Sequence, residues 1–175
     1  WAVHGRVAFS CRPPLAEDEA WTTNRHIYTK GGFEGEEAAC LTEENPGYDF
    51  APVFSPDGSR LAWLTMAGGN YESDAVGVRL HDVKAGTTTD LLVAEQDFAW
   101  SPQSLEWAKD GTAIYFHADV KARRRLCSIS LTANRHRHAI EQASRRWRGG
   151  RREDSARTRR KIVISTQVAT SNRRT

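Results

Sequence analysis

Hydrophobic and polar residues alternate in short runs along the first three-quarters of the chain. Val76, Val78 and Leu80, for example, place apolar side chains on one face of an extended segment, as a half-buried β-strand requires. We find no apolar periodicity of about 3.6 residues, the period of an amphipathic helix. The pattern therefore predicts an all-β protein built from short strands.

The strands recur at a fixed spacing. Gly5, Gly58 and Gly111 lie 53 residues apart, and each is followed by an apolar segment. These segments are residues 7–10, 61–64 and 114–117. In the first copy the segment begins one residue nearer to its glycine, so we expect a one-residue slip in register there. Such self-similarity at a fixed period is typical of repeat architectures.

The second and third copies share a tight-turn signal. Asp57-Gly58 and Asp110-Gly111 each separate two strand-like runs. Glycine supplies the positive φ that such turns need, and aspartate can accept hydrogen bonds from nearby backbone. We therefore interpret these four residues as structural turn formers.

Further strand-like segments follow each turn. They are residues 25–29 in the first copy, 76–82 and 87–93 in the second, and 126–131 in the third. About four short strands in a unit of roughly 40–50 residues are typical of a β-propeller blade. Residues 1–131 thus predict a partial β-propeller of about two to three four-stranded blades, too few to close a ring. Aromatic residues within the strands predict inter-blade core: Phe54, Trp63, Trp107 and Tyr115.

Charge divides the chain in two. Residues 1–132 hold 12 Lys and Arg against 19 Asp and Glu, whereas residues 133–175 hold 13 against 3. The repeat calls for another strand after Leu131, but the sequence there becomes rich in arginine, and only residues 162–164 resemble a strand. We predict that residues 132–175 form a basic, disordered tail, because high net charge with few large apolar groups cannot offset chain entropy.

Two interpretations of this tail remain open. It can be a natural basic arm that contacts nucleic acid or acidic partners. Alternatively, it is sequence without a selected fold, such as an out-of-frame or mis-joined segment. We favour the second interpretation, because the pattern breaks in the middle of a blade, and we do not expect nucleic acid as a partner.

Composition argues against a membrane-spanning or metal-binding protein. No apolar run approaches the roughly 20 residues that cross a bilayer, so no membrane partner is expected. Three widely spaced cysteines, Cys11, Cys40 and Cys127, lack the paired spacing of a zinc site, and neither a metal nor another cofactor is expected; we interpret them as small buried hydrophobes. The chain begins with Trp1 and has no visible signal peptide. We therefore expect further sequence upstream, where an address signal could lie.

The segment from Asn45-Pro46-Gly47-Tyr48-Asp49 through Ser55-Pro56-Asp57-Gly58 to Met66 resembles the propeller of the prolyl oligopeptidase family of serine peptidases. Within that family it is most similar to the dipeptidyl-peptidase V and acylaminoacyl-peptidase branch. Three further segments support the resemblance: residues 20–24, 69–74 and 101–107. The resemblance covers residues 1–131.

The resemblance implies a second domain beyond this propeller. Members of the family carry an α/β-hydrolase domain with a nucleophilic serine on a Gly-x-Ser-x-Gly elbow, followed by Asp and His. The chain contains no such elbow, and Ser59 lies in a hairpin turn. We therefore expect no catalytic residues here and no peptidase activity from this chain alone. Peptide substrates would be partners through the missing hydrolase domain.

In the family the propeller gates access to the active site, and acidic side chains on the propeller side can bind the free amino group of a peptide. A buried ammonium must be paired, or its burial costs several kcal/mol. The candidates for this role are Glu72, Asp74 and Tyr71, in the loop after Met66. The alternative is a solvated acidic loop, and Tyr48 and Asp49 have the same two interpretations.

A different class remains possible for the whole segment. Ser-Pro-Asp-Gly also occurs in non-catalytic TolB-like and WD-like propellers, which act as scaffolds for protein interaction. A Gly-x-Ser-x-Gly elbow downstream of Leu131 in the gene would favour the peptidase, and a stop after complete blades would favour the scaffold. Relatives by resemblance are secreted or cytoplasmic, so the sequence leaves the compartment unknown.

Overall fold

The computed structural model describes residues 2–3, 5–13, 22–31, 36–69, 73–94, 101–120, 122–131, 137–142 and 160–165. Every regular element in these ranges is a β-strand. A helix with the length and apolarity to cross a membrane is therefore not found within them. The predicted all-β class is confirmed.

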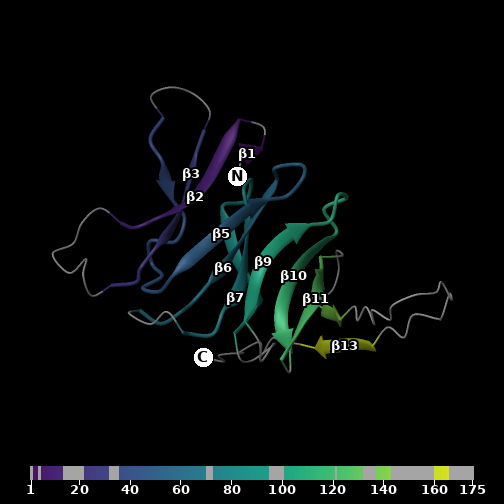
Figure 1. The fold of residues 1–175 in the computed structure, drawn as a ribbon. Helices are drawn as coiled ribbons and strands as arrows, with labels where there is room; N and C mark the ends of the chain where they lie inside the picture. The colour runs from purple at the N-terminus through teal and green to yellow at the C-terminus, as the bar shows by residue number, and fades with distance from the viewer. Residues whose placement is uncertain are drawn as a thin grey trace, which may run out of the picture.

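Consecutive strands form antiparallel meanders, each of them a propeller blade (Figure 1). Blade 1 contains β1 (Ala2–Val3), β2 (Arg6–Cys11), β3 (His26–Lys30) and β4 (Ala39–Cys40). Blade 2 contains β5 (Asp49–Phe54), β6 (Arg60–Thr65), β7 (Gly77–Asp82) and β8 (Thr87–Leu92). Blade 3 contains β9 (Pro102–Trp107), β10 (Ala113–Val120) and β11 (Arg123–Ser130). These bounds confirm the predicted partial propeller.

Two further strands lie in the basic region that follows blade 3. β12 (Arg137–Gln142) pairs with β13 (Arg160–Ser165) and lies beside β11. β13 includes residues 162–164, the segment whose sequence resembles a strand. β12, in contrast, lies in a stretch where the sequence pattern predicts none.

The hairpin turn between the first two strands is the same in blades 2 and 3. Ser55 N donates to Arg60 O at 2.8 Å, and Ala108 N donates to Ala113 O at 2.8 Å, 53 residues further along. Gly58 and Gly111 have φ of 68° and 69°, where a side chain would strain the backbone. Both turns form as the Asp-Gly signals predict.

The turn aspartates act on the backbone of their own turns. Oδ1 of Asp57 accepts from Ser59 N at 3.1 Å, and Oδ1 of Asp110 accepts from Thr112 N at 3.0 Å. Asp57 also accepts from the Ser55 hydroxyl at 2.6 Å. These hydrogen bonds favour the ionised form, and the Ser55 hydroxyl contributes most to lowering the pKa of Asp57 to about 2.

This lowered pKa predicts a pH-dependent contribution to stability. The pKa of Asp57 is lower in the folded than in the unfolded chain, so its contribution is complete above the ordinary aspartate pKa of about 4 and is lost as the pH falls toward 2. Asp57→Asn should therefore be less stable than the parent chain at pH 7 and nearly as stable near pH 2. Urea unfolding across this range measures the difference, and a difference that is independent of pH would contradict the account.

The one-residue slip expected in blade 1 is confirmed. Val3 pairs with Arg6, and two residues separate them in sequence, whereas six residues separate the paired Phe54 and Leu61 in blade 2. Ala8, three residues after its glycine, faces blade 2 and packs there in one cluster with Leu61. The alternation of side chains in β2 is thus displaced by one relative to Gly5.

Two apolar clusters fill the spaces between the blades. The cluster between blades 1 and 2 consists of five buried residues: Ala8, Ile27, Phe54, Leu61 and Trp63. A larger cluster joins blades 2 and 3, and its members include Ala62, Leu64, Val78, Trp107, Ile114, Phe116 and Ile129. Burial of this apolar surface is the main stabilising contribution to the stacking of the blades.

Arg60 of blade 2 contacts blade 3 at the hairpin end of the interface between these two blades. The Arg60 guanidinium lies 5.3 Å from the ring centroid of Trp107 and donates to Gly111 O at 3.1 Å. The Trp107 indole in turn donates to Val53 O at 3.1 Å. These contacts join the hairpins of two successive repeats.

Two sequence-based assignments of core residues are wrong. Tyr115 is 40% exposed, because β10 directs Ile114 and Phe116 toward blade 2 and Tyr115 to the opposite face. Cys11 is exposed and Cys40 is half-buried, so of the three cysteines Cys127 alone is a core residue. Burial raises the pKa of the Cys127 thiol to about 11.

Candidate functional site

The loop that follows β6 is held together by Asp74. Its Oδ2 accepts from Gly68 N at 2.7 Å, and its Oδ1 accepts from Ala75 N at 2.8 Å. Both carboxylate oxygens thus bind loop backbone while the side chain stays half-buried. Tyr71 and Glu72, the other two candidates, lie outside the described residues.

A buried asparagine fixes this loop to the segment that precedes β5. Nδ2 of Asn45 donates to Oδ2 of Asp49 at 2.9 Å and to Met66 O at 3.1 Å. Oδ1 of Asn45 accepts from Gly47 N at 3.3 Å. Residues 45–49 and Gly69, the first residue of segment 69–74, therefore lie at the same edge of blade 2.

Asp49 faces inward, away from this edge. It is fully buried, and its Oδ1 accepts from the Trp63 indole at 3.1 Å. Its backbone oxygen accepts from the Ser10 hydroxyl of blade 1 at 2.6 Å. Asp49 is consequently a structural residue that a peptide cannot contact. Neither interpretation from the sequence, peptide binding or a solvated acidic loop, fits its burial.

Tyr48 belongs to the junction between blades 1 and 2. Arg25 and Tyr48 form an isolated parallel bridge, and the Arg25 guanidinium lies 5.5 Å from the Tyr48 ring centroid. The Tyr48 ring also packs against Phe50, with 5.1 Å between centroids. The side chain is half-buried, so part of it is accessible at the edge.

Polar atoms beside this bridge lack hydrogen-bond partners. Thr23 Oγ1, Asn24 Oδ1 and His26 Nδ1 are buried and unpaired, although Asn24 Nδ2 lies 3.5 Å from His26 Nε2. Unpaired buried polar atoms are unfavourable. The sequence pattern alone assigns these residues no role. Thr23 and Asn24 do, however, lie within residues 20–24, one of the segments that resemble the peptidase family.

Catalytic groups are not assembled in the described part of the chain. Ser104 Oγ lies 3.1 Å from His117 Nδ1 on the exposed face of blade 3, but among the described residues we find no carboxylate bound to the other ring nitrogen. A serine and a histidine need such an orienting group to act as a catalytic triad. No group of three or more metal-ligating side chains is found among these residues either.

Sequence comparisons relate the chain to proteins named dipeptidyl-peptidase 5. No protein-family model matches the chain. The chain is 30% identical over 142 residues, 81% of its length, to dipeptidyl-peptidase 5 of Porphyromonas gingivalis. It is 35% identical over 135 residues, 73% of its length, to dipeptidyl-peptidase 5 of Arthroderma otae. It spans only 20% and 18% of those two proteins, about one fifth.

A comparison of structures supports the fold. The crystal structure of TolB from Acinetobacter baumannii matches 80% of this chain, which in turn spans 30% of TolB, with a TM-score of 0.54 and 16% sequence identity. A likeness at this identity shows the fold alone. Together with the sequence similarity, it identifies a propeller part like that of a dipeptidyl-peptidase 5.

Proposed function

We propose that this dipeptidyl-peptidase 5-like propeller part belongs to a serine peptidase of the prolyl oligopeptidase family. In this proposal the propeller gates access to a hydrolase domain that lies outside the 175 residues. The observation that carries it is the 30% identity over 142 residues to a protein named dipeptidyl-peptidase 5.

The edge of blade 2 is the proposed contact with the peptide N-terminus. Asp74 brings the ends of the loop together, and the loop carries Tyr71 and Glu72 in sequence. Because both oxygens of Asp74 already bind backbone, Glu72 is the carboxylate we assign to the ammonium group, with Asp74 as its positioning residue. A carboxylate beside an ammonium forms a charge-assisted hydrogen bond.

The proposal predicts selective binding of peptides with a free amino terminus. We expect a short peptide labelled at its carboxyl end to bind the chain in fluorescence anisotropy, and its N-acetylated twin to bind about tenfold more weakly. Glu72→Gln should remove this preference, whereas Asp90→Asn, on the outer strand β8, should retain it. Equal binding of the two peptides by the parent chain would contradict the proposal.

The same chain should not hydrolyse peptides. A dipeptide arylamide should remain intact in its presence, because the described residues hold no Ser-His-carboxylate arrangement and the sequence holds no Gly-x-Ser-x-Gly elbow. Turnover that persists through repeated purification would show that this chain carries catalytic groups of its own.

A further inference from the structure

A pocket opens between blades 1 and 2 at the end of the molecule that carries the hairpin turns. Its volume is about 700 Å³, within the range of about 300–1,000 Å³ for small-molecule sites. Gly5 precedes β2, Gly31 follows β3 and Val83 follows β7, and all three line the pocket. Both walls thus belong to blades that the structure describes, so a further blade on either outer face would leave the pocket in place.

The wall of the pocket is apolar where the two blades meet. Leu41 of blade 1 and Val83 of blade 2 line it, are half-buried and pack against the cluster between the blades. Small side chains lie beside them in blade 1, because Thr29 pairs with Ala8 on one side and with Ala39 on the other. Apolar surface therefore stays accessible between the blades, and a ligand that covers it removes that surface from water.

Two cationic residues line the mouth of the pocket. Arg6 and Lys30 are exposed, and an ion pair of either residue is not found within the described part of the chain. Arg6 lies on the side of β2 that faces blade 2, because it is two residues before the buried Ala8. Its guanidinium is thus available to an anion that enters between the blades.

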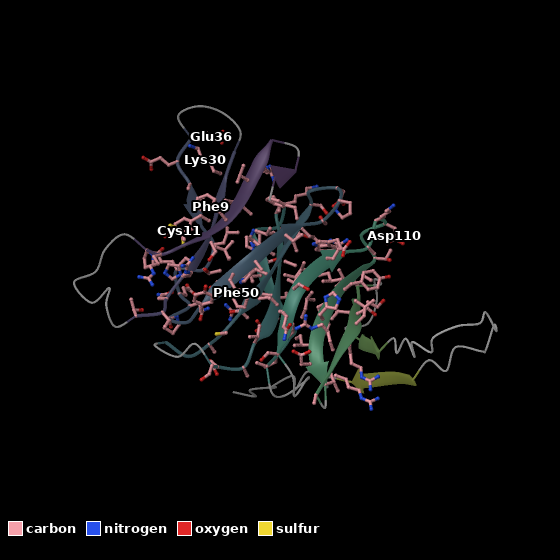
Figure 2. The ribbon with its side chains drawn as sticks, viewed as in Figure 1. Phe9, Cys11, Lys30, Glu36, Phe50 and Asp110 are labelled. Atoms are coloured by element: carbon pink, nitrogen blue, oxygen red, sulfur yellow. The ribbon has the colours of Figure 1, made fainter. Side chains whose placement is uncertain are left out.

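One carboxylate, that of Glu36, lies at the same mouth. It occupies the space that a side chain at residue 31 would need, which favours glycine there. In Figure 2 Lys30 and Glu36 lie together at this end of blade 1. Two cationic residues against one carboxylate leave the mouth with an excess of positive charge.

His81 forms part of the wall without adding charge. It pairs with Leu61 in the strand register and therefore faces blade 1, and its Nδ1 lies 3.0 Å from the Thr88 hydroxyl oxygen. Burial lowers the pKa of its ring below the ordinary histidine value, so the ring is neutral at pH 7. The excess positive charge of the mouth therefore comes from its arginine and its lysine.

We propose that this pocket binds a small carboxylic acid with an apolar chain, in its ionised form. A carboxylate can accept two parallel hydrogen bonds from the Arg6 guanidinium, and the chain would cover Leu41 and Val83. An ammonium group would instead be repelled by the two cations, and acetate would leave the apolar wall uncovered. The pocket lies at the opposite strand ends from the loop of Gly69 and Asp74. This site is therefore separate from the proposed contact with the peptide N-terminus.

Isothermal titration calorimetry of the 175-residue chain at pH 7 tests the proposal with octanoate as the probe. We expect octanoate to bind, and acetate and octylammonium each to bind at least about tenfold more weakly. In methyl NMR spectra, octanoate should shift the signals of Leu41 and Val83. Absence of octanoate binding at millimolar concentration would overturn the proposal. So would equal binding of octylammonium, or shifts at Leu126 on the outer face of blade 3 in place of Leu41 and Val83.

Charge variants at the mouth separate this site from non-specific binding. Arg6→Gln should weaken octanoate binding about tenfold, because it removes the cationic donor to the carboxylate. Glu36→Gln should strengthen binding, because it removes a repelling charge, whereas Lys109→Gln, at an exposed lysine of the blade 3 hairpin, should leave the affinity unchanged. Circular dichroism confirms that each variant is folded, and Lys30→Gln, with a smaller expected loss, replaces Arg6→Gln if that variant is not. An unchanged affinity in Arg6→Gln, or a lower one in Glu36→Gln, would contradict the proposal.

Discussion

Trp63→Ala should lower the free energy of unfolding by about 3–5 kcal/mol, the usual range for removal of a fully buried tryptophan. The Trp63 ring is completely buried between blades 1 and 2, in a cluster of only five residues. Its removal leaves a cavity there and also leaves Asp49 Oδ1 without the indole hydrogen bond. Urea denaturation followed by far-UV circular dichroism measures the loss without depending on tryptophan fluorescence.

Two control variants separate these contributions. Trp63→Phe keeps most of the apolar volume, so it should cost less than Trp63→Ala and report mainly the lost indole hydrogen bond. Leu126→Ala removes an exposed side chain from blade 3 and should change the free energy of unfolding by less than about 0.5 kcal/mol. A loss below about 1 kcal/mol for Trp63→Ala would mean that blades 1 and 2 do not pack through this cluster.

Asp49→Ala should destabilise the chain by roughly 2–4 kcal/mol, because it removes a buried carboxylate that accepts hydrogen bonds from two buried donors. These donors are the Trp63 indole at 3.1 Å and the Asn45 amide at 2.9 Å. The Asn45 amide retains Met66 O as an acceptor, whereas Asp49 is the acceptor of the Trp63 indole within the described part of the chain. The measurement is again urea unfolding at neutral pH.

Asp90 provides the matched control for Asp49. It pairs with Arg79 at 2.8 Å, but the aspartate side chain is 52% exposed, and exposed ion pairs contribute about 0–1 kcal/mol. Asp90→Ala should therefore cost far less than Asp49→Ala. Equal losses from the two substitutions would show that Asp49 is solvated and is not part of a buried network.

The repeat could be predicted because its signals are local. Positive φ at Gly58 and Gly111 and acceptance of backbone hydrogen bonds by Asp57 and Asp110 depend on residues within one turn. The buried face of 76–80 was likewise predicted from alternation alone, and Val76 and Val78 are buried. Local chemistry was thus sufficient to predict the fold class and the blade unit.

Other features depend on contacts between distant segments, which the pattern does not contain. Tyr115 has the same strand context as buried aromatic residues, but no blade in the described residues covers its face, and it is 40% exposed. The role of Asp49 is decided by Trp63 and Asn45, which close around its carboxylate only in the folded chain. At the candidate site, the sequence identified the loop but could not show that the Asp74 carboxylate accepts hydrogen bonds from the backbone of Gly68 and Ala75.

Nuclear Overhauser contacts between successive blades test the central claim, that three copies of one repeat stack as a propeller part. The structure predicts contacts from the Trp107 indole proton to Val53, across blades 2 and 3, and from the Trp63 ring to Ala8 or Ile27, across blades 1 and 2. Observation of both sets would establish the stacking in solution. Contacts confined to residues within single hairpins would contradict it.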